Sequence, residues 1–287
     1  METKVYLLKG EDAYLLTKEL IRKTNFKLRN KKVLIKPNLT TPATAKEGIT
    51  PDIGIIKAVL ESLKDCDVTI GDCGGNIDFT FKKLGYYDLQ KEFDIKLLDL
   101  NKDEIVYKNV SKPYVFNKIP IAKTVLDSEY VINISKLKIH SLSKVTLSIK
   151  NMFGCVPTRF NRLRIHPHIN KALLDIMQIV RSDFNIIDGI YGNQGDEVVS
   201  NPVHSSILIG GYDMISCDII GSKCMGVNPD DIEHIRLARE LFGERDIKLI
   251  GENVENVKKD YKKDLMWSTR MRYRFEKGLG YLLRKRF

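Results

Sequence analysis

The chain has 287 residues, of which 43% are hydrophobic and 29% charged, enough for a substantial core in one large α/β domain or two unequal ones. No stretch approaches the roughly 18 to 20 apolar residues that cross a bilayer, and the first residues carry no apolar signal segment, which argues against secretion and membrane insertion. The five cysteines have no paired short spacings, which argues against a disulfide framework and indicates a reducing cytoplasm.

The first part of the chain predicts strands that alternate with helices. The expected elements are a strand at Lys4–Leu8, a helix near Ala13–Thr24, a strand at Lys32–Lys36, a helix from Thr50-Pro51-Asp52 to about Leu63, and a strand at Asp67–Ile70. Lys32–Lys36 is almost wholly apolar, as in a strand covered on both faces. Pro37 ends it because proline has no amide hydrogen. This rhythm is typical of βαβ units with a parallel sheet.

Residues 94–118 interrupt the rhythm. Ile95–Leu100, Ile105–Tyr107 and Tyr114–Phe116 alternate with polar turns, which suggests short antiparallel strands in an insertion or at an edge. Parallel order then resumes with strands at Tyr130–Ile134, Asn185–Asp188 and Ser205–Ile209 and helices at about Ile169–Arg181, Met214–Met225 and Asn228–Leu241. We therefore predict an α/β core domain over residues 1–250, with a mostly parallel sheet flanked by helices and a small antiparallel insertion near 94–118.

Charged and glycine residues gather at four predicted strand ends. The strands run into Lys36 and Asn38, into Asp72 with Gly74 and Gly75, into Lys136, Lys138 and His140, and into Asp188 with Gly189 and Gly192. The carboxyl ends of neighbouring parallel strands lie at one edge of a sheet, where ligands bind. We therefore predict one crevice that holds a small anionic substrate. Lys150, Asn151, Arg164 and His166 follow the third strand and extend this basic stretch.

Within this crevice we assign roles by chemistry. His140, Lys136, Asp72 and Asp188 are the candidate catalytic residues, with His140 transferring a proton. The candidate substrate-binding residues are Lys36, Asn38, Gly74, Gly75, Lys138, Lys150, Asn151, Arg164 and His166. A divalent ion shared by Asp72 and Asp188 is an open alternative.

Each signal also has a structural explanation. The glycine turn fits a plain tight turn, since it matches neither GxGxxG nor a Walker A loop. Asp72 and Asp188 also suit helix caps, and His140 also suits a satisfied core histidine. The neighbouring arginines also suit an exposed loop. Because all of these residues occur together at predicted strand ends, we favour a binding site over the separate structural explanations.

Five blocks of sequence resemble a known family. They are VLIKPN at 33–38, IGD at 70–72, SKLKIHSLSKVTLSIKNMFGCVP at 135–157, IIDGIYGNQG at 186–195 and GYDMISCDIIGSKCMGVNPDDI at 211–232. Together they look like the iron–sulfur-associated family called domain of unknown function 362, over about residues 30–243. The resemblance implies a redox-associated protein, with an oxidoreductase as the open enzyme class. Family members often carry ferredoxin-type cysteine runs, which this chain lacks, so an iron–sulfur cluster is expected on an electron-donor partner.

The C-terminal residues 251–287 form a separate, basic tail. From Lys258 to Phe287 there are eleven Lys and Arg against three Asp and Glu, a net charge of +8. Trp267, Met271, Phe275, Leu279 and Leu282 repeat at helical spacing. Packing on the protein's own body, an anionic membrane surface, RNA and an acidic protein are the open partners of this tail. The alternative function is therefore a non-catalytic binding or scaffold protein, cytoplasmic or peripheral at a membrane.

Overall fold

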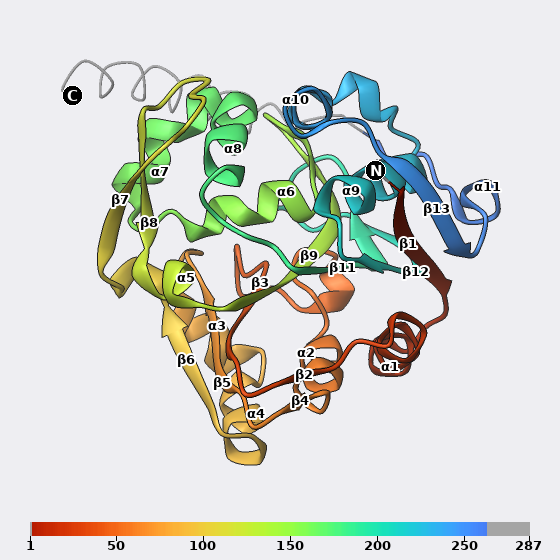
Figure 1. Ribbon diagram of the computed structural model, residues 1–287. Coiled ribbons are helices and arrows are strands. Elements are labelled where there is room, and N and C mark those ends of the chain that lie inside the picture. The colour runs from red at the N-terminus through yellow and green to blue at the C-terminus, as the bar shows by residue number, and fades with distance from the viewer. Residues whose placement is uncertain (1, 263–287) are drawn as a thin grey trace.

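The computed structural model describes residues 2–262 (Figure 1). Its strands are β1 (Glu2–Lys9), β2 (Leu28–Arg29), β3 (Lys32–Pro37), β4 (Leu63–Lys64), β5 (Asp67–Asp72), β6 (Ile95–Asp99), β7 (Ile105–Asn109), β8 (Lys118–Ala122), β9 (Tyr130–His140), β10 (Lys144–Thr146), β11 (Phe184–Asn193), β12 (Pro202–Gly211) and β13 (Asp246–Gly251). Its helices are α1 (Ala13–Thr24), α2 (Ile53–Leu60), α3 (Ile77–Lys83), α4 (Tyr86–Glu92), α5 (Lys123–Asp127), α6 (Ser148–Asn151), α7 (Arg159–Ile165), α8 (Ile169–Met177), α9 (Met214–Cys224), α10 (Glu233–Phe242) and α11 (Val254–Val257).

A nine-stranded sheet runs through the molecule in the order β13-β1-β12-β11-β9-β3-β5-β6, with β10 beside β9. The strands from β11 to β6 are all parallel to one another. β12 is antiparallel to both β11 and β1, while β13 is parallel to β1 at the far edge. The predicted α/β fold with a mostly parallel sheet is confirmed.

Helices cover the two faces of this sheet. Figure 1 shows α6, α8 and α9 on one face and α1, α2 and α4 on the other. Strand residues alternate between the two cores because successive side chains point to opposite faces. On β3, Leu34 joins the core under α6, α8 and α9, whereas Val33 and Ile35 join the core over α1 and α2. The site residues lie where these buried strands end.

The small antiparallel insertion exists, but its strands differ from the prediction. Ile95–Asp99 is the parallel edge strand β6, paired with β5, and not an antiparallel strand. β7 pairs with β8, placing Ile105 opposite Ala122. Tyr114–Phe116 forms no strand because its three backbone N–H groups donate to the Asp175 carboxylate at 2.6–3.0 Å. Those donors are thus unavailable for a ladder.

Strand β9 extends to His140, beyond the predicted end at Ile134. Lys136, Lys138 and His140 alternate along it with the buried Leu137 and Ile139. The lysines stay in the strand because carbonyl oxygens of the loop over residues 38–52 accept hydrogen bonds from their ammonium groups. Burial of a charged group is tolerated only where such partners exist.

The packed body continues past residue 250. Val257 and Tyr261 are buried, and the Tyr261 hydroxyl hydrogen-bonds Ser205 Oγ at 2.9 Å. The rest of the predicted tail lies outside the described residues. Among the helices of residues 2–262, none combines the length and apolar character needed to cross a membrane.

Candidate functional site

A pocket of about 270 Å³ opens at the carboxyl edge of β3, β5 and β9. Seven of the predicted site residues line it: Asn38, Asp72, Gly74, His140, Lys150, Asn151 and His166. Further lining residues that we had not predicted for the site are Thr40, Cys73, Phe153, Gly154, Arg159, Arg162, Leu163, Glu197 and Val198. The predicted convergence of strand ends therefore holds for β3, β5 and β9.

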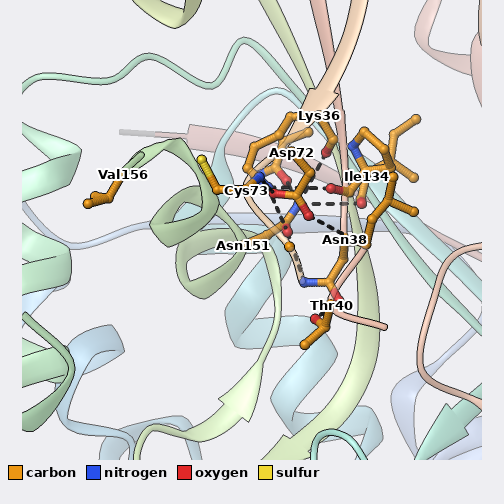
Figure 2. Close-up of polar contacts among 12 residues, drawn as sticks. Lys36, Asn38, Thr40, Asp72, Cys73, Ile134, Asn151 and Val156 are labelled. Atoms are coloured by element: carbon orange, nitrogen blue, oxygen red, sulfur yellow. Dashed lines mark hydrogen bonds and ion pairs between the residues drawn. The ribbon is translucent and has the colours of Figure 1, made fainter. Parts of the chain in front are cut away.

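The floor of the pocket is a buried ion pair. Lys36 Nζ lies 2.7 Å from Asp72 Oδ1, and Figure 2 shows both side chains pointing toward Asn151. Asp72 also accepts hydrogen bonds from the backbone N–H groups of Leu39, at 2.7 Å, and Cys73, at 2.8 Å. This carboxylate thus ties the turn after β3 to the turn after β5, and Lys36 offsets its charge.

Asn151 connects the floor to strand β9. Its Oδ1 accepts from Lys36 Nζ at 3.1 Å and from Asn38 Nδ2 at 2.9 Å. Its Nδ2 donates to Asn133 Oδ1 at 2.8 Å and to the Lys36 carbonyl at 3.2 Å. All the hydrogen-bonding capacity of this amide is used inside the protein, so Asn151 positions the floor.

Gly154 packs directly on the ion pair. A Cβ atom at this position would lie 2.2 Å from Asp72 Oδ1 and 2.6 Å from Lys36 Nζ. Non-bonded atoms do not approach this closely, so a side chain here would displace the pair. The glycine of the MFGC segment therefore allows the backbone after α6 to close over the floor.

The second predicted group lies apart from this pocket. Lys136 Nζ and Asp188 Oδ2 form their own buried pair at 2.7 Å, and Asp188 also accepts from the backbone N–H groups of Asp52 and Ile190. Neither residue lines the pocket. The single crevice that we predicted is thus two separate ion pairs, because the loop over residues 38–52 lies above Lys136.

Lys138 is also enclosed beside the pocket. Its ammonium contacts Asn38 Oδ1 at 2.9 Å, and the carbonyls of Ile49 and Glu197 at 3.1 and 3.3 Å. Burial lowers the pKa of Lys138 to about 7, an effect that the charge of Glu197 partly opposes. Its contact with Asn38 makes it a support of the pocket wall.

His140 presents a neutral imidazole to the pocket. Its Nδ1 accepts from the backbone N–H groups of Leu142 at 3.1 Å and Ser143 at 3.3 Å, which places the ring hydrogen on Nε2. Burial, and then the charge of Lys150, hold the pKa of His140 well below its usual value. Within residues 2–262 the Nε2–H has no hydrogen-bond partner, so it remains a donor for a ligand.

Lys150 is the partly exposed cation of the pocket. Its Nζ lies 4.6 Å from the centroid of the Phe153 ring. The rings of Phe153 and His166 stack on each other, with 5.8 Å between their centroids. Burial of the ammonium lowers the pKa of Lys150 to about 8, an effect that Glu197 partly opposes. The amine therefore changes protonation state close to neutral pH.

Helix α7 supplies arginines that differ from the predicted one. Arg159 and Arg162 line the pocket, whereas Arg164 does not. Arg162 donates to Asn101 Oδ1 at 2.8 Å and to the Val156 carbonyl at 3.0 Å. Helical spacing could have found the residues that line the pocket, since Arg159, Arg162, Leu163 and His166 follow the pattern i, i+3, i+4 and i+7 of one helix face.

The described residues show no ready metal centre. Within residues 2–262, no group of three or more His, Cys, Asp or Glu side chains is placed to hold a metal ion. All five cysteines are free, and Cys73, which lines the pocket, has its pKa raised well above the usual value by burial. It is therefore a protonated thiol. Asp72 and Asp188, the predicted metal candidates, each pair with a separate lysine.

Comparisons with known proteins identify a family and proteins that resemble this chain. A family model described as Domain of unknown function (DUF362) matches residues 33–223. A curated relative, the thylakoid-associated protein sll1697 from Synechocystis sp., is 26% identical over 230 residues, which cover 76% of this chain and 70% of the relative. The lactate racemase apoprotein from Thermoanaerobacterium thermosaccharolyticum is a solved structure with 11% identity and a TM-score of 0.45. The match covers 75% of this chain and 56% of that structure.

Proposed function

The chain belongs to the DUF362 family, whose description names no reaction, and we propose from the pocket that it is an enzyme that binds a small organic anion and moves a proton on it. One observation carries this proposal. A partly exposed ammonium, Lys150, and a neutral imidazole N–H, His140, line the same pocket above a floor whose carboxylate is already neutralised.

The charge balance of the pocket favours an anion. Asp72 is paired with Lys36, so its negative charge is offset before a ligand enters. Glu197 is the remaining carboxylate of the wall, and it accepts hydrogen bonds from Ser141 N at 3.2 Å and Ser141 Oγ at 3.0 Å. Lys150, Arg159 and Arg162 oppose it. Three cations against one carboxylate leave the wall positive, which suits a carboxylate or phosphate group.

The size of the pocket suits a small ligand. Its volume of about 270 Å³ falls just below the roughly 300–1,000 Å³ of pockets that hold drug-sized molecules. A ring-sized or smaller organic acid therefore fits. The stacked Phe153 and His166 rings give one wall an apolar face for the carbon skeleton.

The two titratable groups suit different steps of proton transfer. An acid or base works best when its pKa lies near the working pH, and the pKa of Lys150 is about 8. Lys150 is therefore the proposed proton acceptor or donor. His140 stays neutral, so its Nε2–H donates a hydrogen bond to negative charge that develops on the substrate oxygen. Asp72 and Asn151 hold the floor in place and do not move the proton.

The redox role is a narrower proposal that rests on the family resemblance alone. In that version the enzyme receives electrons from an iron–sulfur partner and Lys150 supplies the accompanying proton. A divalent ion at Asp72 would have to displace the Lys36 ammonium, which lies 2.7 Å away. The proton-transfer proposal requires neither an iron–sulfur partner nor a divalent ion.

Calorimetric titration with acetate, malonate and inorganic phosphate tests the anion site. We expect Lys150→Ala to weaken binding about tenfold, roughly 1.4 kcal/mol, because a charge-assisted hydrogen bond is lost. Lys171→Ala, which removes an exposed lysine on α8, is the matched control. Equal anion affinity of the wild type and Lys150→Ala would show that the anion does not bind at Lys150.

Deuterium exchange tests the proton transfer itself. The protein is incubated in D₂O with small carboxylic acids that carry a C–H bond next to the carboxylate, and proton NMR follows loss of that signal. Exchange that depends on Lys150 supports the enzyme. Binding without exchange of any acid would leave a non-catalytic anion-binding protein.

A second candidate is a peripheral membrane protein. The net charge of +8 over residues 258–287 supports it, and the Synechocystis relative is named a thylakoid-associated protein. We expect the full chain to cosediment with vesicles that contain phosphatidylglycerol and not with purely zwitterionic ones. Changing Arg270, Arg272 and Arg274 together to Gln should reduce that binding. If the full chain binds RNA and not the vesicles, the partner is a nucleic acid and the membrane proposal is wrong.

A further inference from the structure

We propose that the ligand of the pocket carries a second anionic group of the phosphate class, which lies in a wider groove outside the pocket. This inference rests on the proposed anion site and extends it to a substrate class. The outer groove has a volume of about 730 Å³. It is continuous with the pocket, because Thr40, Cys73, Gly74, Arg159 and Arg162 line both.

Arg159 is the unengaged cation at this junction. Its side chain is exposed, and among residues 2–262 it makes no hydrogen bond or ion pair. The other cations of the groove are already held. Arg162 donates to Asn101 and Val156, and Lys102 pairs with Asp78. A guanidinium without an internal partner is free to grip a tetrahedral oxyanion with two parallel hydrogen bonds.

The acidic residue of the groove does not cancel this attraction. Asp99 Oδ1 accepts from the backbone N–H of Asn101 at 3.0 Å and from Asn101 Nδ2 at 2.7 Å. Lys102 Nζ lies 3.9 Å from its other oxygen. The Asp99 carboxylate is thus occupied at the end of β6, while Arg159 and Arg162 both remain on the groove wall.

The glycine turn leaves room for the second group. A Cβ atom at Gly75 would meet only the Thr40 carbonyl, at 3.6 Å, so the space beside this backbone is open. Gly74, in contrast, packs against the Leu39 carbonyl and joins the wall to the floor. A ligand can therefore place a small acid group beside Lys150 and extend past Gly75 to Arg159.

Two-headed probes test the inference. Phosphonoacetate, 3-phosphonopropionate and 4-phosphonobutyrate are compared by calorimetry with acetate, propionate and butyrate. We expect at least one phosphono acid to bind tenfold or more tightly than its parent acid. Arg159→Ala should weaken binding of that probe by a larger factor than binding of the parent. Lys150→Ala should weaken both. Arg29→Ala, an exposed arginine on β2 that lines neither cavity, is the control and should change neither.

The outcomes separate the two proposals. If the parent acids bind in a Lys150-dependent manner but no phosphono acid gains affinity, the second subsite is wrong and the proposed function stands. Equal losses for probe and parent in Arg159→Ala would also overturn it, because the arginine would then act in the inner pocket. If no probe binds, or if Lys150→Ala changes nothing, the proposed function fails and the inference fails with it.

Discussion

Substitution of Gly154 by alanine should disrupt the floor of the pocket. The new Cβ would lie 2.2 Å from Asp72 Oδ1 and 2.6 Å from Lys36 Nζ, both buried and tightly held. Overpacking of this kind costs about 1–3 kcal/mol, and separation of a buried ion pair costs about 3–5 kcal/mol. Reduced backbone entropy of the unfolded chain returns about 0.4–1 kcal/mol. We therefore expect the free energy of unfolding to fall by about 3–8 kcal/mol.

Urea unfolding followed by circular dichroism measures this loss. With a slope of about 1–3 kcal/mol per molar urea, the midpoint should move down by roughly 1 M or more. Gly75→Ala is the matched control, because its Cβ meets a single atom at 3.6 Å and the backbone there is not left-handed. It should be neutral or slightly stabilising. Equal midpoints for the two variants would refute the close packing of Gly154 on the ion pair.

Three further predictions concern the pocket and its surroundings. Anion affinity should be constant below pH 8 and fall by about tenfold in total between pH 8 and pH 10, the same loss as in Lys150→Ala, because the Lys150 ammonium, whose pKa is about 8, loses its charge; a flat calorimetric profile to pH 10 would contradict this. Asp188→Ala should lower the free energy of unfolding by about 3–5 kcal/mol, since Lys136 loses its partner, while anion affinity of the folded protein stays within twofold; a large affinity loss would return Asp188 to the site. Asp175→Ala should speed hydrogen exchange at the amides of residues 114–116 and not in β9, because the carboxylate holds those three amides; unchanged exchange would contradict this.

The type and order of most elements could be predicted from the sequence, because apolar periodicity reports which faces are buried. Strand ends were harder. Lys136 and Lys138 looked like the end of a strand, since lysine is seldom buried. The groups that make their burial possible come from far along the chain, such as Asn38, which lies 100 residues from Lys138. No local pattern contains that information.

Residues that line the pocket could be predicted from the sequence where they lie at strand ends. The sequence did not reveal which way a side chain faces within a strand or helix. Asn38 follows β3, and Asp72 and His140 are the last residues of β5 and β9, so all three lie at the carboxyl edge of the parallel sheet. Asp188 was also expected at a strand end, but it lies within β11, and its partner Lys136 lies under the loop over residues 38–52, outside the pocket. Arg164 lies outside the pocket because the stretch forms helix α7, which places Arg159 and Arg162 on the pocket wall.

The buried ion pair at the floor bears on the proposed preference of the pocket for an anion. A buried pair often contributes little net stability, because desolvation offsets the attraction between the charges. The Lys36–Asp72 pair nevertheless joins the turns after β3 and β5, through Leu39 and Cys73, and it fixes Asn151. An apolar floor could not make those hydrogen bonds, and an unpaired Asp72 would repel the ligand. The pair therefore makes the floor polar but without net charge. The proposed ligand preference then depends on the balance between the positive charges of Lys150 and the α7 arginines and the negative charge of Glu197.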